Sequence, residues 1–238
     1  MSEVTVTPFR ENEKVILSEL VKRVGALERQ LALLSDAREI ASLQSRYIYY
    51  LQAHQYDQIV EMFARHEPVS IEMDNLGKFI GREKAADVFL MVLKPLYTMK
   101  GAMGLHMLTT PLVEVHPDGR QAWGMWHTLG CNTQPDFVGR DMEMTGDPEL
   151  IAMWQQGKYF IDFVKEEGEW KWKNFRWYVN FRTPFDQGWV KQPVTGNLSV
   201  VAKLIPGCPP ADGPSEYHPF SPQEQTPFLP IPPLPFKR

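Results

Sequence analysis

Tyrosines and histidines are concentrated in one helical stretch, SRYIYYLQAHQYDQIVEMFARH, at residues 45–66. It carries four tyrosines and two histidines at a point where an ordinary amphipathic helix would bury leucines. Tyr47, Tyr50, Leu51 and His54 follow spacings of three and four residues, so they share one face of a helix. Phenols on such a face can stack on an aromatic ligand and donate hydrogen bonds to it. We therefore interpret this helix as one wall of a ligand pocket.

Lys158 and Tyr159 are neighbours on a predicted strand, so their side chains point to opposite faces of a sheet. The face of Tyr159 continues with apolar residues, which indicates that Tyr159 faces the interior, although a bulge would reverse this assignment. A buried Lys158 would have a lowered pKa and could act as a base. The alternative is an ordinary solvated lysine.

The last predicted strand places a mixed set of residues on one face by alternation: Trp170, Trp172, Asn174, Arg176 and Tyr178. Arg176 buried in a cavity would need an anionic partner, and the alternative is an exposed arginine at the rim. Trp126 and His127 are adjacent on another strand, so only one of them can point inward. We choose Trp126, because Ala122 and Gly124 give its face small residues.

Composition limits the possible functions. The chain has 238 residues, 43% of them hydrophobic and 23% charged, which suits one globular domain with additions. Its net charge of −4 argues against a nucleic-acid surface. The two cysteines have no metal-like spacing, which favours a reducing compartment without a zinc site. No apolar run is long enough for a membrane span, so we expect a soluble, cytoplasmic protein. The sequence also has no metal-ligand cluster, phosphate-binding loop or dinucleotide-binding fingerprint, so we expect chemistry without a metal or cofactor.

The order of predicted elements indicates an α+β fold. Residues 12–35 repeat leucine and valine at spacings of three and four, which is a narrow seam of the coiled-coil type. Ser35 is predicted to cap a second helix that runs to about residue 54, and a short helix is predicted at 56–66. A hairpin turns at Asp74-Asn75-Leu76-Gly77, residues 82–99 are helical, and four long strands follow from residue 103.

We divide the chain into an N-terminal helical extension at 1–35, a central domain at 36–189 and a proline-rich C-terminal arm at 190–238. Eleven of the twenty prolines lie between Pro206 and Pro235. The arm is too apolar for solvated disorder, so we expect it to lie over the domain or over a neighbouring subunit.

Four motifs in this order resemble the SnoaL-like branch of the nuclear-transport-factor-2-like superfamily. They are RYIYYLQAHQYDQIVEMFA, FIGREKAADVF, HMLTTPLVEVHPDGRQAWG and GKYFIDFVKEEGEWKW, and together they cover about residues 36–182. The resemblance implies a strongly curved antiparallel sheet wrapped around helices, forming a cone with a deep apolar cavity. The fold hosts dehydratases, isomerases, cyclases, hydrolases and binding proteins, so it does not fix the activity.

The resemblance places His106 where several of these enzymes have a histidine that acts as general acid or base. The alternative is a core histidine with a satisfied hydrogen bond. The helix aspartate of the family's dehydratases falls near Gln52, and the approximate position of their strand histidine holds Trp126. Because an amide cannot accept a proton as a carboxylate does, the usual aspartate–histidine dyad is missing.

The activity that fits this resemblance is a cofactor-independent lyase that removes water and formaldehyde from a lignin-derived diarylpropane diol, giving a stilbene through a quinone methide. The alternatives are a dehydratase or isomerase acting on a polycyclic substrate, and a non-catalytic binding module. We expect a small aromatic substrate and a homo-oligomer, a trimer in preference to a dimer. The catalytic candidates are His106, Tyr50, Tyr159, Lys158 and Arg176. The substrate-binding candidates are Tyr47, Gln52, His54, Trp126, Asn174 and Tyr178.

Overall fold

The structure is a computed structural model that describes residues 11–135, 149–194, 198–216 and 218–237. Residues 1–10, part of the predicted N-terminal extension, lie outside the described residues. Helices and one six-stranded sheet follow in the predicted order, which confirms the α+β class. No helix in the described part of the chain combines the length and apolar character needed to cross a bilayer.

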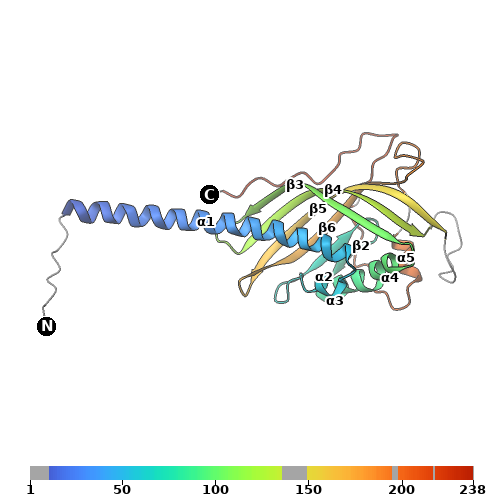
Figure 1. Ribbon diagram of the computed structural model, residues 1–238, viewed down its shortest axis with the longest axis horizontal. Coiled ribbons are helices and arrows are strands. Elements are labelled where there is room, and N and C mark those ends of the chain that lie inside the picture. The colour runs from blue at the N-terminus through green and yellow to red at the C-terminus, as the bar shows by residue number, and fades with distance from the viewer. Residues whose placement is uncertain (1–10, 136–148, 195–197, 217, 238) are drawn as a thin grey trace.

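Helix α1 spans Glu11–Gln52 without interruption, so the prediction of two helices divided at Ser35 is wrong. The Ser35 hydroxyl contacts the Glu39 carboxylate at 3.4 Å and caps no helix end. Leucine, alanine, glutamate and arginine dominate this stretch and favour helix continuation through a single serine. The second half of α1 lies along the sheet, whereas the first half extends beyond it (Figure 1).

Asp36 marks the point at which α1 meets the sheet. It is the first buried residue of the helix, and its Oδ1 accepts hydrogen bonds from Trp170 Nε1 at 2.9 Å and from Lys165 Nζ at 2.5 Å. From there the buried residues follow the 3.6-residue period of a helix: Ile40, Gln44, Tyr47, Ile48 and Leu51. This stripe faces the interior that the sheet encloses.

The short elements after α1 complete the helical side. Helix α2 spans Tyr56–Val60 and ends before the predicted boundary at residue 66. The hairpin of β1 (Ser70–Met73) and β2 (Gly77–Ile80) turns where expected. The helix predicted at 82–99 consists of α3 (Arg82–Asp87), the π-helical segment η1 (Val88–Leu93) and α4 (Lys94–Thr98).

The four long strands are β3 (Met103–Val115), β4 (Gln121–Pro135), β5 (Leu150–Glu166) and β6 (Glu169–Pro184). The sheet order is β2-β1-β6-β5-β4-β3, and the sheet curves around the second half of α1 (Figure 1). All neighbouring strands are antiparallel except β1 and β6, which pair in parallel. The curved sheet therefore carries one parallel pair that the sequence pattern did not indicate.

A β-bulge in β6 decides which side chains reach the interior. Asp162 pairs with Asn174 and Phe163 pairs with Trp172, so Lys173 is an extra residue on β6. One extra residue reverses the alternation that follows it. The buried face therefore passes from Trp172 to Phe175, and Asn174, Arg176 and Tyr178 point outward. A second extra residue at Asn180, where Gln156 pairs with Phe181 and Gly157 with Val179, reverses the alternation again before Arg182.

Helix α5 (Leu198–Leu204) precedes an extended C-terminal arm, described at residues 205–216 and 218–237, which lies on the outer face of its own domain (Figure 1). The arm begins beside the sheet edge, where Lys78 N–H donates to Gly213 O at 2.9 Å and Asp212 N–H donates to Lys78 O at 2.8 Å. Phe220 N–H donates to Asn180 O on β6, and Lys158 on β5 contacts Phe228 and Pro230, so the arm passes over the outside of both strands. Its end then runs back along the sheet (Figure 1). There the ring of Phe236 meets that of His116 edge-on, with centroids 4.9 Å apart.

Candidate active site

Aromatic rings from α1 and the sheet meet in the interior. Tyr47 is enclosed, and its ring makes edge-on contacts with Tyr159, Trp172 and Phe175 at centroid distances of 5.7, 5.1 and 5.5 Å. Such edge-to-face pairs stabilise each other beyond simple burial. The helix thus brings a phenol to the centre of the sheet's concave face, next to the second buried phenol, that of Tyr159.

Three of the predicted residues form a buried hydrogen-bonded chain. Tyr47 Oη lies 3.4 Å from Tyr159 Oη, and Tyr159 Oη lies 2.9 Å from Nδ1 of His106. The residues come from α1, β5 and β3, and each is at most 4% exposed. Tyr159 therefore faces the interior, and it is the central member of this chain. We call these three residues the relay.

A buried arginine fixes the proton positions of the relay. Arg182 Nε donates to Gln155 Oε1 at 3.2 Å, and because an arginine can only donate, the oxygen of this amide must face it. The amide nitrogen of Gln155 then faces Nε2 of His106 in a short contact. Nε2 must accept, so the proton of the neutral imidazole is on Nδ1, from which it is donated to Tyr159.

Arg182 is held in place by an acid. Its Nη2 lies 2.6 Å from Oδ2 of Asp74, and the two side chains are 3% and 1% exposed. Oδ2 has no partner in linear hydrogen-bond geometry among the described residues, so this contact is a close ion pair. A buried pair of this kind is costly to disrupt from one side. The Asp74–Arg182 pair thus anchors Gln155 and, through it, His106.

Burial sets the protonation states of the relay. It lowers the pKa of His106 from 6.5 to about 3, and the nearby Arg182 charge acts in the same direction. Burial also raises the pKa of Tyr159 and of Tyr47 well above the usual tyrosine value. All three groups are therefore uncharged at neutral pH. The arrangement suits transient proton transfer through Tyr159 with a hydrogen bond from His106 behind it.

A second branch of the polar cluster ends at Tyr97. Gln155 Nε2 also donates to Asn132 Oδ1 at 3.2 Å, and Asn132 Nδ2 donates to Tyr97 Oη at 3.4 Å. The sequence reasoning missed Gln155, Arg182, Asp74, Asn132 and Tyr97. Gln155 could have been found, because it shares the parity of Tyr159 on β5. Arg182 could not, because its inward direction follows bulges in the β5–β6 pairing.

Four predicted site residues lie on the outer face of the sheet: Lys158, Asn174, Arg176 and Tyr178. The bulge at Lys173 directs Asn174, Arg176 and Tyr178 outward, so their expected alternation with Trp172 is wrong. The guanidinium of Arg176 pairs with Asp162 at 2.7 Å and covers the Phe160 ring at 4.2 Å. Arg176 thus has the anionic partner expected of it, but on the side opposite to the relay.

The remaining outer-face contacts hold the arm and the first strand. Lys158 Nζ donates to the carbonyl oxygen of Phe228 in a short contact and to that of Pro230 at 3.4 Å. Partial burial lowers its pKa. Asn174 Oδ1 accepts from the Ser70 hydroxyl at 2.8 Å. Lys158 is therefore an attachment point for the arm, and it faces away from Tyr159.

The site residues predicted on the first long helix do not share one face. Tyr50 precedes Leu51 by one residue, a step of about 100° around the helix, and lies outside the buried stripe. It lines an open groove together with Leu43, Arg46 and Met62. His54 lies beyond the end of α1, with a positive φ of 57° and an exposed side chain. The shared face predicted for Tyr47, Tyr50 and His54 is therefore wrong.

Gln52 and Trp126 keep an inward position in different places. Gln52 Nε2 donates to the backbone oxygen of His106 at 3.2 Å, at the base of the relay. Trp126 is 3% exposed and meets Phe163 edge-on at 6.3 Å, whereas the neighbouring His127 is exposed. Gln52 therefore contacts the backbone of His106 and not its imidazole, whose partners are Tyr159 and Gln155.

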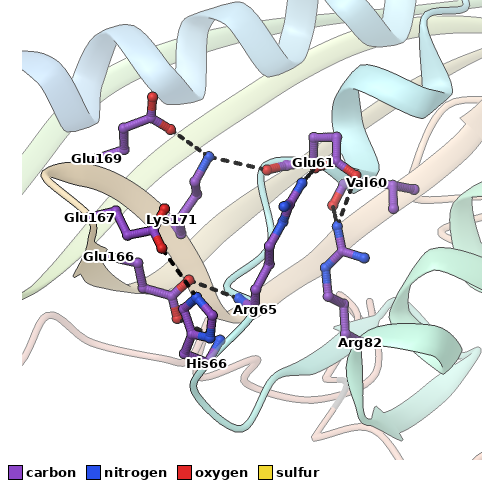
Figure 2. A network of polar contacts seen from close by, with 9 residues as sticks. All are labelled: Val60, Glu61, Arg65, His66, Arg82, Glu166, Glu167, Glu169 and Lys171. Carbon is purple, nitrogen blue, oxygen red and sulfur yellow. Dashed lines mark hydrogen bonds and ion pairs between the residues drawn. The ribbon is translucent and has the colours of Figure 1, made fainter.

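The groove beside Tyr50 is bordered by a surface network of charges (Figure 2). Lys171 Nζ contacts Glu169 at 2.8 Å, and Arg82 reaches Glu61 at 3.1 Å. The carboxylates of Glu169 and Glu61 are 72% and 49% exposed, so solvent screens both pairs and each contributes little energy. The network connects the end of α2 with the β5–β6 turn and does not resemble a reaction centre.

Within the described residues, no three histidine, cysteine, aspartate or glutamate side chains are grouped as a metal site would require. The candidate active site is therefore the relay with its Gln155–Arg182–Asp74 support.

The family can now be stated from the sequence profile that matches the chain. The profile of the SnoaL-like domain matches residues 32–176, which is more than half of the chain. This range includes all three relay residues and, of their support, Asp74 and Gln155 but not Arg182. The chain belongs to the SnoaL-like domain family. This family is part of the nuclear-transport-factor-2-like superfamily, so the resemblance seen in the four motifs is confirmed.

Solved structures share the fold of this SnoaL-like protein at low identity. A hexachlorocyclohexane dehydrochlorinase (LinA, type 2) is 18% identical with a TM-score of 0.53, covering 66% of this chain and 93% of its own. A putative scytalone dehydratase from Novosphingobium aromaticivorans is 15% identical with a TM-score of 0.51, covering 66% and 91%. A LinA type 3 dehydrochlorinase from Novosphingobium barchaimii gives 17%, 0.51, 66% and 94%. No curated protein matched the chain.

Proposed function

We propose that this SnoaL-like protein is a cofactor-independent lyase that eliminates water and formaldehyde from a two-ring diarylpropane diol to give a stilbene. The observation that carries the proposal is the relay: two enclosed phenols and a neutral histidine whose tautomer is fixed by Arg182 through Gln155. The surrounding aromatic rings suit a substrate that is itself aromatic.

The first step is loss of the benzylic hydroxyl. Tyr159 gives its proton to the departing oxygen, and the C–O bond breaks with both bonding electrons leaving on the oxygen of the water molecule. The para-phenol of the substrate supplies the electrons and becomes a quinone methide as its own proton is released. The Nδ1–H of His106 stabilises the negative charge that develops on Tyr159 Oη, because a hydrogen bond to a charged oxygen is stronger than one to a neutral oxygen. His106 is thus a positioning residue and Tyr159 the proton donor.

The second step breaks the carbon–carbon bond. Tyr159 recovers a proton from the terminal hydroxyl, whose O–H electrons form the carbonyl of formaldehyde. The two electrons of the broken C–C bond form the new double bond of the stilbene. The quinone methide accepts the displaced electrons, becomes a phenolate and regains a proton. The sum is diol to stilbene, water and formaldehyde, with no oxidant, reductant or net proton. The substrate supplies the electron sink, so no cofactor enters the scheme.

The solved neighbours support an elimination reaction in general. They are described as dehydrochlorinases and as a putative scytalone dehydratase, and both activities remove a small molecule without breaking a carbon skeleton. This favours, as the second candidate, a dehydratase that acts on a polycyclic alcohol through the same Tyr159 and His106. Formaldehyde is the product that separates the two reactions.

The test is to incubate the protein with para-hydroxylated diarylpropane diols and to measure free formaldehyde and stilbene absorbance. We expect equal amounts of both products. Tyr159→Phe should lower kcat about 10²- to 10⁴-fold, the contribution of a placed proton donor. Tyr178→Phe is the matched control, because Tyr178 is buried on the outer face, and it should retain turnover. A dehydrated product without formaldehyde would favour the dehydratase. Tight ligand binding without any product would indicate a binding module.

We further propose that the protein acts as a homo-oligomer, a trimer, assembled through the first half of α1. The leucines and valine of the coiled-coil seam are about half exposed or more in the single chain: Leu17, Leu20, Val24, Leu27, Leu31 and Leu34. Ile16 and Val21 widen the seam beyond that of a two-stranded coil. In a parallel coil, Arg23 would face Glu28 of the next copy, because they occupy g and e positions. We place this oligomer in the cytoplasm, since both cysteines are free thiols.

A further inference from the structure

Gln44 is a buried polar residue for which neither the fold nor the proposed relay has a use. It lies on α1 three residues before Tyr47, within the stripe that faces the sheet, and it is 0% exposed. Residues three apart on a helix are neighbours on its surface. The amide is therefore directed into the same interior as the relay.

The amide of Gln44 lacks partners among the described residues. Both Oε1 and Nε2 are fully enclosed, and neither makes a hydrogen bond there. Gln155 and Gln52, the other two inward glutamines of the site, are both hydrogen-bonded. Buried amides are almost always satisfied, so an unsatisfied one in a native fold requires an explanation. One established explanation is a ligand that completes the bonds.

The two indole groups beside the relay have the same property. Trp172 Nε1 and Trp177 Nε1 are enclosed without a described partner. Trp172 lies 5.1 Å from Tyr47 and Trp177 lies 6.0 Å from Tyr159, measured between ring centroids. The relay is therefore flanked by unpaired indole donors and by one amide that can both donate and accept.

These groups define the chemistry of a ligand. A hydroxyl group satisfies an amide in both directions, because its oxygen accepts from Nε2 and its hydrogen is donated to Oε1. Indole N–H groups require additional acceptor oxygens. A carboxylate is excluded at Gln44, because it would face the amide oxygen with no hydrogen to donate. The fit is an aromatic ring that bears a hydroxyl group, with further oxygens near the indoles.

We propose that Gln44 is a substrate-binding residue that holds a ring hydroxyl of the ligand by one donated and one accepted hydrogen bond. The proposal rests on the proposed function for the position of the substrate in this interior, but the binding chemistry of Gln44 does not require that any bond be broken. It predicts that Gln44 lowers the stability of the free protein and gives selectivity for hydroxylated rings in return.

The experiment compares Gln44→Leu with Gln52→Leu, the same substitution on the same helix. Gln52 has a described hydrogen-bond partner and Gln44 has none. Without ligand, Gln44→Leu should raise the melting temperature or leave it unchanged, whereas Gln52→Leu should lower it. A Gln44→Leu protein that melts below the wild type would overturn the proposal, because the amide would then have a structural partner.

Binding is then measured by quenching of tryptophan fluorescence with two probes: a stilbene that has a para-hydroxyl on each ring, and stilbene itself. The wild type should prefer the hydroxylated probe. Gln44→Leu should weaken binding of this probe by about ten- to a hundredfold and leave the hydroxyl-free probe unchanged. Equal losses for both probes, or none, would overturn the proposal.

Formaldehyde release and ligand selectivity distinguish the lyase activity from the role of Gln44. If wild-type protein releases no formaldehyde from any diol, yet Gln44→Leu loses selectivity for the hydroxylated stilbene, the lyase proposal fails and the role of Gln44 stands. If formaldehyde is released with the same KM by wild type and by Gln44→Leu, the lyase stands and the role of Gln44 fails.

Discussion

Replacing Arg182 by methionine should destabilise the protein strongly, because it leaves the carboxylate of Asp74 buried without its cation. The two side chains are 3% and 1% exposed, and their charged atoms are 2.6 Å apart. Removing one partner of such a pair costs about 3–5 kcal/mol of unfolding free energy. Solvent screening reduces this figure little at such depth, in contrast to surface pairs.

A second substitution separates the charge from the packing. Asp74→Asn removes the carboxylate while keeping a residue that tolerates the positive φ of 50° at this position. Alone, Asp74→Asn leaves Arg182 as a buried charge and should cost a similar amount. The double variant contains no unpaired charge, so most of the loss should be recovered.

Urea denaturation followed by tryptophan fluorescence measures all four proteins. With a slope of about 2 kcal/mol per molar urea, Arg182→Met should lower the midpoint by roughly 1.5–2.5 M, and the double variant should return near the wild-type midpoint. If the two single losses simply add in the double variant to within about 0.5 kcal/mol, the ion pair is not coupled and the reasoning is refuted.

The same variant tests the proton positions in the relay. Arg182 fixes the amide of Gln155, and that amide makes Nε2 of His106 an acceptor. Nitrogen-15 NMR of labelled histidine should show His106 as the neutral Nδ1–H tautomer in the wild type at pH 7. In Arg182→Met this preference should weaken. A wild-type imidazole protonated at Nε2 would contradict the assignment.

Two further predictions concern acid stability and assembly. The pKa of His106 falls from 6.5 to about 3 on folding, so the unfolded state binds more protons in this interval, and the contribution of His106 is complete above pH 6.5 and is lost as the pH falls toward 3. Each pH unit below 6.5 should lower the free energy of unfolding by about 1.4 kcal/mol through this group. Urea titrations between pH 6.5 and 4.5 should therefore show a smaller loss of stability per pH unit for His106→Asn than for the wild type. An equal loss in both proteins would contradict the pKa shift. Leu27→Lys, in the exposed seam, should convert the oligomer into monomers, as measured by light scattering, without lowering the melting temperature of the core domain. Lys22→Leu is the control, because residue 22 lies outside the a and d positions. An unchanged mass for Leu27→Lys would exclude assembly through α1.

The fold followed from local patterns because each pattern has one structural solution. Leucine and alanine at helical spacing gave the course of α1, the Asp74–Gly77 turn gave the hairpin, and alternating strands separated by Pro-Asp-Gly and Glu-Glu-Gly turns gave the long hairpins. The motif order identified the family, and a profile match over 32–176 confirmed it. The helix break at Ser35 was wrong, since a serine can cap a helix but does not end one.

The site was only partly accessible to the same reasoning. Tyr47 was identified from helical spacing and Tyr159 from the alternation of an apolar strand, whereas His106 was identified only through the resemblance to the SnoaL-like family. Arg176, Asn174 and Tyr178 were placed on the wrong face, because one inserted residue at Lys173 reverses the side chains from there to the next bulge at Asn180, and no local pattern records a bulge.

The sequence by itself therefore determined the elements, their order, the family and the three relay residues. The tertiary structure alone decided how they are used. It brought Asp74 and Arg182 together across 108 positions of sequence, turned Gln155 so that it fixes the tautomer of His106, and enclosed the amide of Gln44. The physical reason is that hydrogen-bond direction and desolvation depend on which atoms meet in space, and those meetings are set by strand register and curvature, not by residue type.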